Sequence, residues 1–343
     1  LNNVEATVGG MVAGNDTLLG MAREYANTAQ MLLDDVQSNY RVELLCPGRL
    51  KPVLDAYNDS QSEIAMAGKI PTNASVARLQ ARQALERAVQ LREEVMYAEQ
   101  QWNMNYEATR QVLDMTETQI QSRQQVTLEE ENATVNVNHW TAGDLDNLSN
   151  RLANLNGQMN NAQGLTITEL NEIQSAGLQI GREVEDTTVF AAEAFFASQD
   201  RGEIAHDITR QLCDFGLSVI GHSYQGNDQR SAHRLHLRNG VTGFDIVITQ
   251  TPEVKADGTI VNRLESDILN YGSLNQAHGD DIARSVLGSL SGLGFSQTPV
   301  STVAGYETSA SDRVEVANFE TWRTETEPVI ARPNRTEQVK TPA

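Results

Sequence analysis

The fold of this chain is decided by residues 74–113, which read ASVARLQARQALERAVQLREEVMYAEQQWNMNYEATRQVL. Between Pro71 and Gly143 the chain has neither proline nor glycine for 71 residues. Proline and glycine are common helix terminators, and helices of globular proteins average only about 10–14 residues. The stretch therefore predicts one long helix that forms an extended rod.

A heptad pattern runs along this predicted helix. Its apolar members are Ala81, Leu85, Ala88, Val95, Trp102, Tyr106, Leu113 and Ile120. The same register passes through the polar residues Arg92, Glu99, Thr109, Thr116 and Arg123. A free-standing dimeric coiled coil requires apolar side chains at nearly all of these positions. The helix is therefore expected to pack against neighbours in its own chain.

The flanking segments supply those helical neighbours. Residues 132–143 mix amides with β-branched side chains, which favours a turn, so the tip of a helical hairpin is predicted there. Leucines then recur at helical spacing from Leu145 onward, and Thr166 with Glu169 forms a capping box that starts another helix. Further helices are predicted at residues 18–45 and 53–66. Residues 1–199 are thus expected to form a helical hairpin or bundle of coiled-coil-like character.

The hydrophobic period changes after residue 199. Asp200 and Glu203 have capping-box spacing, and an apolar helical stripe follows over residues 204–215. Turn sequences such as Asn239-Gly240 then separate strand-like runs at residues 217–224, 232–238, 244–251 and 259–264. A final helix is predicted at residues 282–293. This order indicates a small antiparallel α+β domain over residues 200–295. Residues 296–343, rich in Thr, Ser, Glu and Pro, are expected to be a mostly disordered tail.

Composition excludes several classes of partner. The chain has 343 residues, a formal net charge of −20 and only 4 lysines. Proteins that bind nucleic acid or anionic lipid need excess Lys and Arg, so neither partner is expected. There is no membrane-length apolar run and no signal-peptide pattern at the start, which predicts a cytoplasmic protein. Two cysteines, Cys46 and Cys213, are too few for a disulfide framework, and both are expected to be reduced and buried.

Motifs that carry chemistry are missing from the sequence. Most of the histidines fall in residues 200–295, but His233 and His236 are three apart on a predicted strand and therefore point to opposite faces. No zinc, EF-hand, P-loop or dinucleotide-binding motif is present. Asp280 and Asp281 are interpreted as the start of a helix rather than as metal ligands. No metal, cofactor or catalytic residue is expected.

One strand face is a candidate binding surface. If His233 and the leucines beside it face the core, the opposite face carries Arg234, His236 and Arg238. Residues 228–238 hold three Arg and one Asp, a net charge of +2 in an acidic chain. These three side chains, together with Tyr224 and His222, are predicted to dock an acidic helix or peptide. The alternative is that they only keep an open sheet face hydrated.

Three aromatic residues are further candidates for partner contact. Trp140 lies in the predicted hairpin tip, where it either contacts a partner or packs locally. Phe319 and Trp322 share one side of a possible short helix in the tail, which either docks on a partner or folds back onto the sheet.

The sequence thus predicts a non-enzymatic interaction or scaffolding protein. Its helical rod sets a distance or drives self-association, which makes a homo-oligomer possible, and its α+β module binds a protein partner. The alternative is an enzyme or enzyme subunit with a pocket between rod and sheet that uses His222, His236 or Asp245. An enzyme requires titratable groups that converge in a concave pocket.

Overall fold

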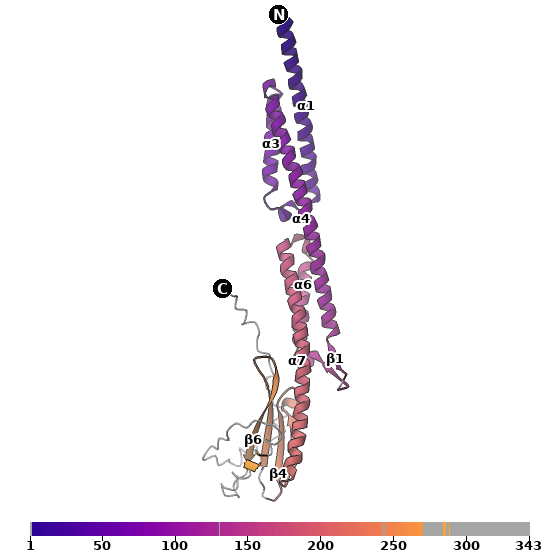
Figure 1. Cartoon of the computed structure of the whole chain (residues 1–343), viewed down its shortest axis with the longest axis vertical. Helices are drawn as coiled ribbons and strands as arrows, with labels where there is room; N and C mark the ends of the chain where they lie inside the picture. The colour runs from indigo at the N-terminus through magenta and orange to yellow at the C-terminus, as the bar shows by residue number, and fades with distance from the viewer. Residues whose placement is uncertain are drawn as a thin grey trace, which may run out of the picture. The chain divides into compact units, whose positions relative to one another are not determined.

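The fold is α+β: a long helical stretch is followed by a small antiparallel four-stranded sheet (Figure 1). A computed structural model describes residues 2–129, 131–241, 243, 245–269, 284, 285 and 288. The predicted disordered tail, with Phe319 and Trp322, lies outside the described residues. So does most of the predicted final helix, of which Arg284, Ser285 and Gly288 are described and helical.

Helices make up the first half, as predicted. They are α1 (Asn2–Asn39), α2 (Val42–Leu45), α3 (Leu50–Ala67), α4 (Ala74–Ser122), α5 (Val137–Trp140) and α6 (Asp144–Met159), with short 3₁₀ turns at Pro71–Asn73 and Ala162–Gly164. The contacts between residues divide the chain into two compact units. The first unit consists of Leu1–Thr118 and Asn150–Gly181, and the second consists of Gln119–Ser149 and Arg182–Ala343. Within the described residues, no helix is long and apolar enough to cross a membrane.

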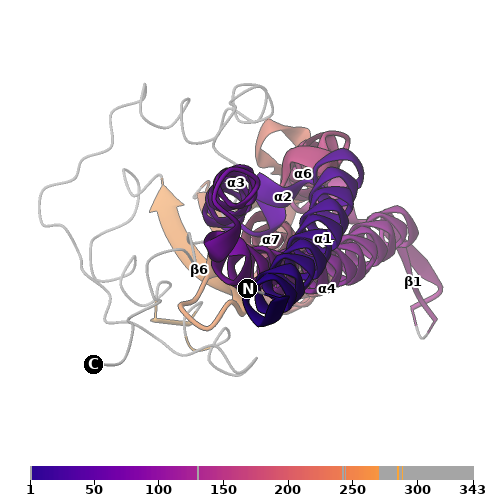
Figure 2. The ribbon, with the colours of Figure 1, turned by 90° about the horizontal axis from the view of Figure 1, so that it is seen from above.

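In the first unit, α1, α3 and α4 lie side by side (Figures 1 and 2). Small side chains on α1 and α4, such as Ala22, Ala26 and Ala81, are fully buried and let the helices approach closely. Arg92, a polar member of the predicted heptad, pairs with Asp35 of α1 at 2.8 Å. Packing of α4 within its own chain is therefore confirmed.

Two other polar heptad positions of α4 join it to α7 (Ile167–Cys213). The hydroxyl of Thr109 donates to the carbonyl oxygen of Leu170 at 3.2 Å, and that of Thr116 donates to Gly177 at 3.3 Å. Thr116 lies seven residues after Thr109, and Gly177 lies seven residues after Leu170, so the two helices run in the same direction here. The threonines are buried, and their hydroxyls also satisfy carbonyls of their own helix.

The predicted hairpin tip is replaced by a small sheet. Helix α4 ends at Ser122, and the strands β1 (Gln125–Leu128) and β2 (Ala133–Asn136) pair antiparallel before α5. Each of these strands has four residues, the lower limit of the length that indicates a strand, so the sequence pattern alone favours a turn.

Helix α7 confirms one predicted start and contradicts another. Thr166 and Glu169 form the expected capping box: the Thr166 amide donates to Glu169 at 2.7 Å, and the Glu169 amide donates to Thr166 Oγ1 at 3.2 Å. The predicted second helix start at Asp200 is wrong, because α7 continues through this residue to Cys213. Cys213 is a free thiol but exposed, so the prediction that it is buried is also wrong.

The predicted four-stranded sheet is confirmed. Its strands are β3 (Leu217–Tyr224), β4 (His233–Asn239), β5 (Asp245–Val254) and β6 (Ile260–Leu269), paired antiparallel in the order β3-β4-β5-β6. Alternate residues face α7 and form one apolar core, made of Ile208, Leu212, Leu217, Leu235, Leu237, Ile246 and Ile248. Strands β4 and β5 thus each present apolar side chains two residues apart to the helix, as the period-two pattern predicts.

Candidate binding site at the edge of the sheet

Strand β3 forms one edge of the four-stranded sheet. It holds no Asp, Glu, Lys or Arg over its eight residues. Two of its apolar side chains are open to solvent, with Val219 40% and Ile220 51% exposed. The pairing with β4 shifts register at Ile220, which is a β-bulge. The edge therefore lacks Asp, Glu, Lys and Arg, and it is apolar in its middle part, at Val219 and Ile220.

A tight turn fixes the position of β3. Gly216, between α7 and β3, has φ +77°, a left-handed conformation that glycine adopts without steric cost. Its amide donates to the Cys213 carbonyl at 3.0 Å. The Asn239 side chain, from the end of β4, donates to the Phe215 carbonyl at 3.3 Å, and Leu217 is buried in the core under α7. The start of β3 is thus anchored while the following residues stay open.

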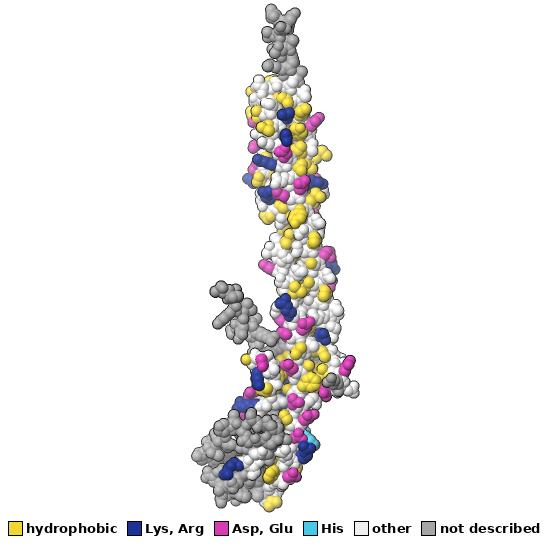
Figure 3. All heavy atoms as spheres, viewed as in Figure 1, with side chains coloured by type: hydrophobic (Ala, Val, Ile, Leu, Met, Phe, Trp, Pro, Cys, Tyr) yellow, Lys and Arg dark blue, Asp and Glu magenta, His cyan; other side chains and the backbone are white. Residues whose placement is uncertain are grey.

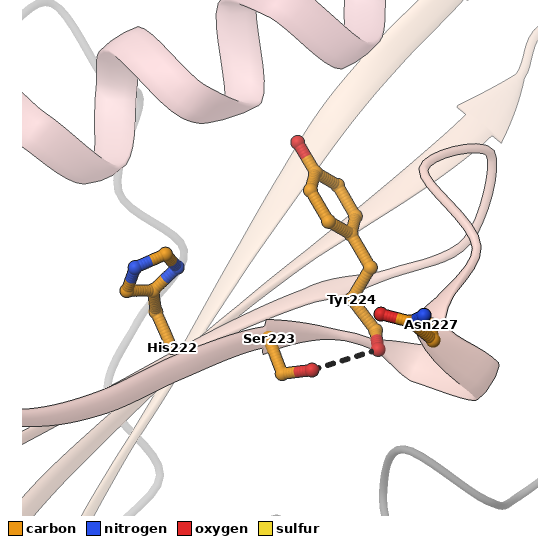
Figure 4. Close-up of a pocket in the computed structure, with 4 residues that line it drawn as sticks. All are labelled: His222, Ser223, Tyr224 and Asn227. Carbon is orange, nitrogen blue, oxygen red and sulfur yellow. Dashed lines mark hydrogen bonds between the residues drawn. The ribbon is translucent and has the colours of Figure 1, made fainter.

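An open hollow of about 400 Å³ lies at the other end of β3 and is lined by His222, Ser223, Tyr224 and Asn227 (Figure 4). The His222 and Tyr224 side chains project to the helix side of the strand. The Ser223 hydroxyl instead donates to the Tyr224 carbonyl at 3.1 Å. Successive side chains on a strand point to opposite faces, so His222 and Ser223 do not form a nucleophile–base pair.

Behind this hollow, a polar cluster is buried between α7 and the sheet. Tyr224, His233 and Gln250 are direct cross-strand neighbours on β3, β4 and β5. The rings of Tyr224 and His233 lie 4.8 Å apart. Arg201 of α7 donates to the Gln229 carbonyl at 2.7 Å and to Asn262 of β6 at 2.8 Å. These groups tie the helix to the loop after β3 and to the far strand.

Burial sets the electrostatics of this cluster. Arg201 is 1% exposed, and desolvation lowers the pKa of its guanidinium despite the opposing charge of Asp200. Desolvation also lowers the pKa of His233 to about 4, and the nearby His222 and Arg201 act in the same direction. His233 is therefore neutral at neutral pH. Leaving a buried polar atom unsatisfied costs about 1–3 kcal/mol, which is why such clusters are sensitive to substitution.

The predicted basic face is mostly neutralised. Arg238 makes a two-pronged ion pair with Asp245 of β5, at 2.6 and 3.0 Å. Burial raises the pKa of Asp245, but the hydrogen bonds and charge of Arg238 outweigh that effect and lower it. The prediction that His236 is open to a partner is wrong, because it is 2% exposed and lies 3.3 Å from Asp245. Arg234 is half-buried.

Trp140 packs locally, which was the alternative interpretation. It is buried, and its indole meets the Phe195 ring edge-on at 5.7 Å between centroids. The neighbouring His139 carbonyl accepts a hydrogen bond from Arg230, which also pairs with Asp228 at 2.6 Å. Trp140 is therefore part of the core of its unit and is not presented to a partner.

Comparisons with known proteins add no relative: no family model, curated protein or solved structure matches the chain. Among the described residues, no three His, Cys, Asp or Glu side chains are grouped to hold a metal ion. Sequence reasoning missed the edge residues Val219 and Ile220, although the lack of charge over residues 217–224 was a visible signal. It also missed Arg201, whose burial no local pattern indicates.

Proposed function

We propose that this chain is a non-enzymatic scaffolding protein whose α+β unit binds a protein partner by accepting an extended segment along β3. The helical part sets a distance or associates with itself. The observation that carries the proposal is the uncharged, apolar edge at Val219 and Ile220.

The two edges of the sheet differ in a way that favours β3. An edge strand presents backbone N–H and C=O groups that another strand can pair with, and proteins usually protect such edges with charge. The opposite edge, β6, carries Arg263 and Glu265, which form an ion pair at 2.8 Å. Within the described part of the chain, strand β3 has no Asp, Glu, Lys or Arg, and its bulge is the one protective feature. Addition of a strand to an exposed edge is a recurrent mode of peptide recognition.

The chemistry of the edge indicates the kind of partner. An acidic helix or peptide gains little from Arg238, because that guanidinium is already paired with Asp245. An extended segment with apolar and β-branched side chains fits Val219 and Ile220 better, since both sides exchange exposed apolar surface for contact. At the far end, His222 and Tyr224 offer polar contacts from the hollow.

The enzyme alternative finds less support. Its three candidate residues do not converge on one site. His236 and Asp245 lie 3.3 Å apart, but His222 lies in register with Leu235 on the helix side of the sheet, opposite to them. A catalytic site needs its acid, base or nucleophile within hydrogen-bond reach of one substrate position.

The proposal is tested by selecting random extended peptides from a display library against the full-length chain. We expect enrichment of uncharged sequences rich in β-branched residues, and binding at least tenfold weaker to an Ile220→Lys variant. Val189→Lys is the matched control, because Val189 is an exposed valine on α7, away from the edge. Equal binding to the wild type and Ile220→Lys would refute the edge as the binding site.

A further inference from the structure

Helix α4 carries a second seam on its outer side. Positions at alternating steps of four and three residues are Tyr97, Gln101, Met104, Ala108, Gln111, Met115 and Thr118. We call this set the outer seam. Its three largest apolar members are open to solvent, with Tyr97 66%, Met104 60% and Met115 65% exposed. Hydrophobic side chains are visible among polar ones on the surface of the helical part (Figure 3).

The outer seam is unusual for a solvent-facing helix surface. The inner seam of the same helix, which includes Trp102 and Leu113, is already buried against neighbours in the chain. The opposite face of such a helix normally carries charged side chains. Here no seam position from residue 97 to residue 118 is charged, although charged residues make up 21% of the chain. Burial of the seam positions themselves therefore desolvates no charge, and the nearest charged residues, Glu107 and Asp114, flank the seam.

The order of residues along the outer seam fits an antiparallel copy of itself. One register places Tyr97 opposite Met115, Met104 opposite Ala108, and Gln101 opposite Gln111. Aromatic rings make favourable contacts with methionine sulfur, and a large side chain fits opposite a small one. Two facing glutamines can hydrogen-bond to each other, and a polar pair in a seam fixes its register.

Parallel pairing lacks this match. It sets Met104 against Met104 and Ala108 against Ala108, which crowds one layer and leaves a gap in another. In the antiparallel register, each flank of the seam meets the same flank of the second copy, so Gln100 lies near Asp114 and Glu107 lies near Glu107. The contact between the two Glu107 side chains is unfavourable and weakens the pairing.

We infer that the outer seam of α4 binds a second copy of this chain in an antiparallel pairing. Residues 97–118 span about 30 Å of helix at roughly 1.5 Å per residue. The surface that one helix face of this length can bury is smaller than the roughly 800 Å² that each partner buries in a typical stable interface. The dimer is therefore weak and forms at high protein concentration. The inference specifies the self-association part of the proposed function.

Sedimentation equilibrium of the full-length chain over a wide concentration range tests the inference. The wild type is expected to dimerise, and Met104→Glu to dimerise at least tenfold more weakly, because each copy then buries a carboxylate. Met31→Glu is the matched control, since Met31 is an exposed methionine on α1 and lies off the seam. A wild type that stays monomeric at every concentration, or equal effects of the two variants, overturns the inference.

Cross-linking tests the direction of pairing. Cysteines are introduced separately by Tyr97→Cys and Met115→Cys into a chain whose Cys46 and Cys213 are replaced by serine. Mixing the two variants is expected to give a disulfide-linked dimer, and neither variant alone is expected to do so. Dimers formed by Tyr97→Cys alone would contradict antiparallel pairing. Because peptide binding at β3 is measured separately, a monomeric chain that still binds peptide would refute the seam and leave the β3 proposal intact.

Discussion

The buried neutral histidine of the α+β unit makes stability depend on pH in a defined window. His233 has a pKa of about 4 in the folded chain and about 6.5 when unfolded. As the pH falls from about 7.5 to about 4.5, His233 binds a proton in the unfolded state but stays mostly neutral in the folded state. The contribution of His233 to the free energy of unfolding is therefore largest at neutral pH and decreases as the pH falls through this window.

The size of the effect follows from the two pKa values. Their difference of about 2.5 units corresponds to at most about 3.4 kcal/mol, of which about 2.5 kcal/mol is lost by about pH 4.5. Burial also lowers the pKa of His236, with the partial opposition of Asp245, so this second histidine adds a loss of the same sign. A comparison with a variant that lacks only His233 is needed to separate the two.

Urea unfolding at a series of pH values measures this quantity. His233→Gln is expected to have a pH dependence that is shallower by about 2–3 kcal/mol over the window, whatever its stability at neutral pH. His206→Gln serves as the control, because His206 is exposed on α7. If His233→Gln and the wild type lose the same free energy of unfolding between about pH 7.5 and about pH 4.5, the reasoning about the buried cluster is wrong.

Three further substitutions test the packing. Gly177→Ala should destabilise the chain by about 1–2 kcal/mol, because the added Cβ would lie 2.9 Å from Leu113 Cδ2. Gly157→Ala, whose Cβ would meet nothing within 4 Å, should stabilise it by about 0.5–1 kcal/mol. Thermal unfolding distinguishes the two variants, and equal shifts in melting temperature would contradict the close approach of α4 and α7. Trp140→Ala should cost about 3–5 kcal/mol in urea unfolding because the indole is buried on Phe195, and a loss below about 1 kcal/mol would show that Trp140 is not part of the core.

Much of the fold could be predicted because local signals agreed with tertiary packing. Strand β3 has the predicted bounds, since turns at Gly216 and Gly226, both with positive φ, mark its two ends. The capping signal at Asp200 misled because its spacing also occurs inside a helix whose apolar stripe continues on both sides.

The candidate site was harder to predict, for a physical reason. Alternation along β4 correctly indicated that His233 faces the core, but it cannot tell whether the opposite face is open. Burial of His236 and the pairing of Arg238 with Asp245 depend on a neighbouring strand and on what covers the sheet. Likewise, β3 becomes an edge only through the order in which the strands pair.

Hydrogen exchange tests the proposed role of β3 most directly. A selected peptide is added to the full-length chain, and amide exchange is compared in β3 and in the charged edge strand β6. We expect slower exchange in Leu217–Tyr224 and no change in Ile260–Leu269. Protection elsewhere in the chain with unchanged exchange in β3 would contradict strand addition at this edge.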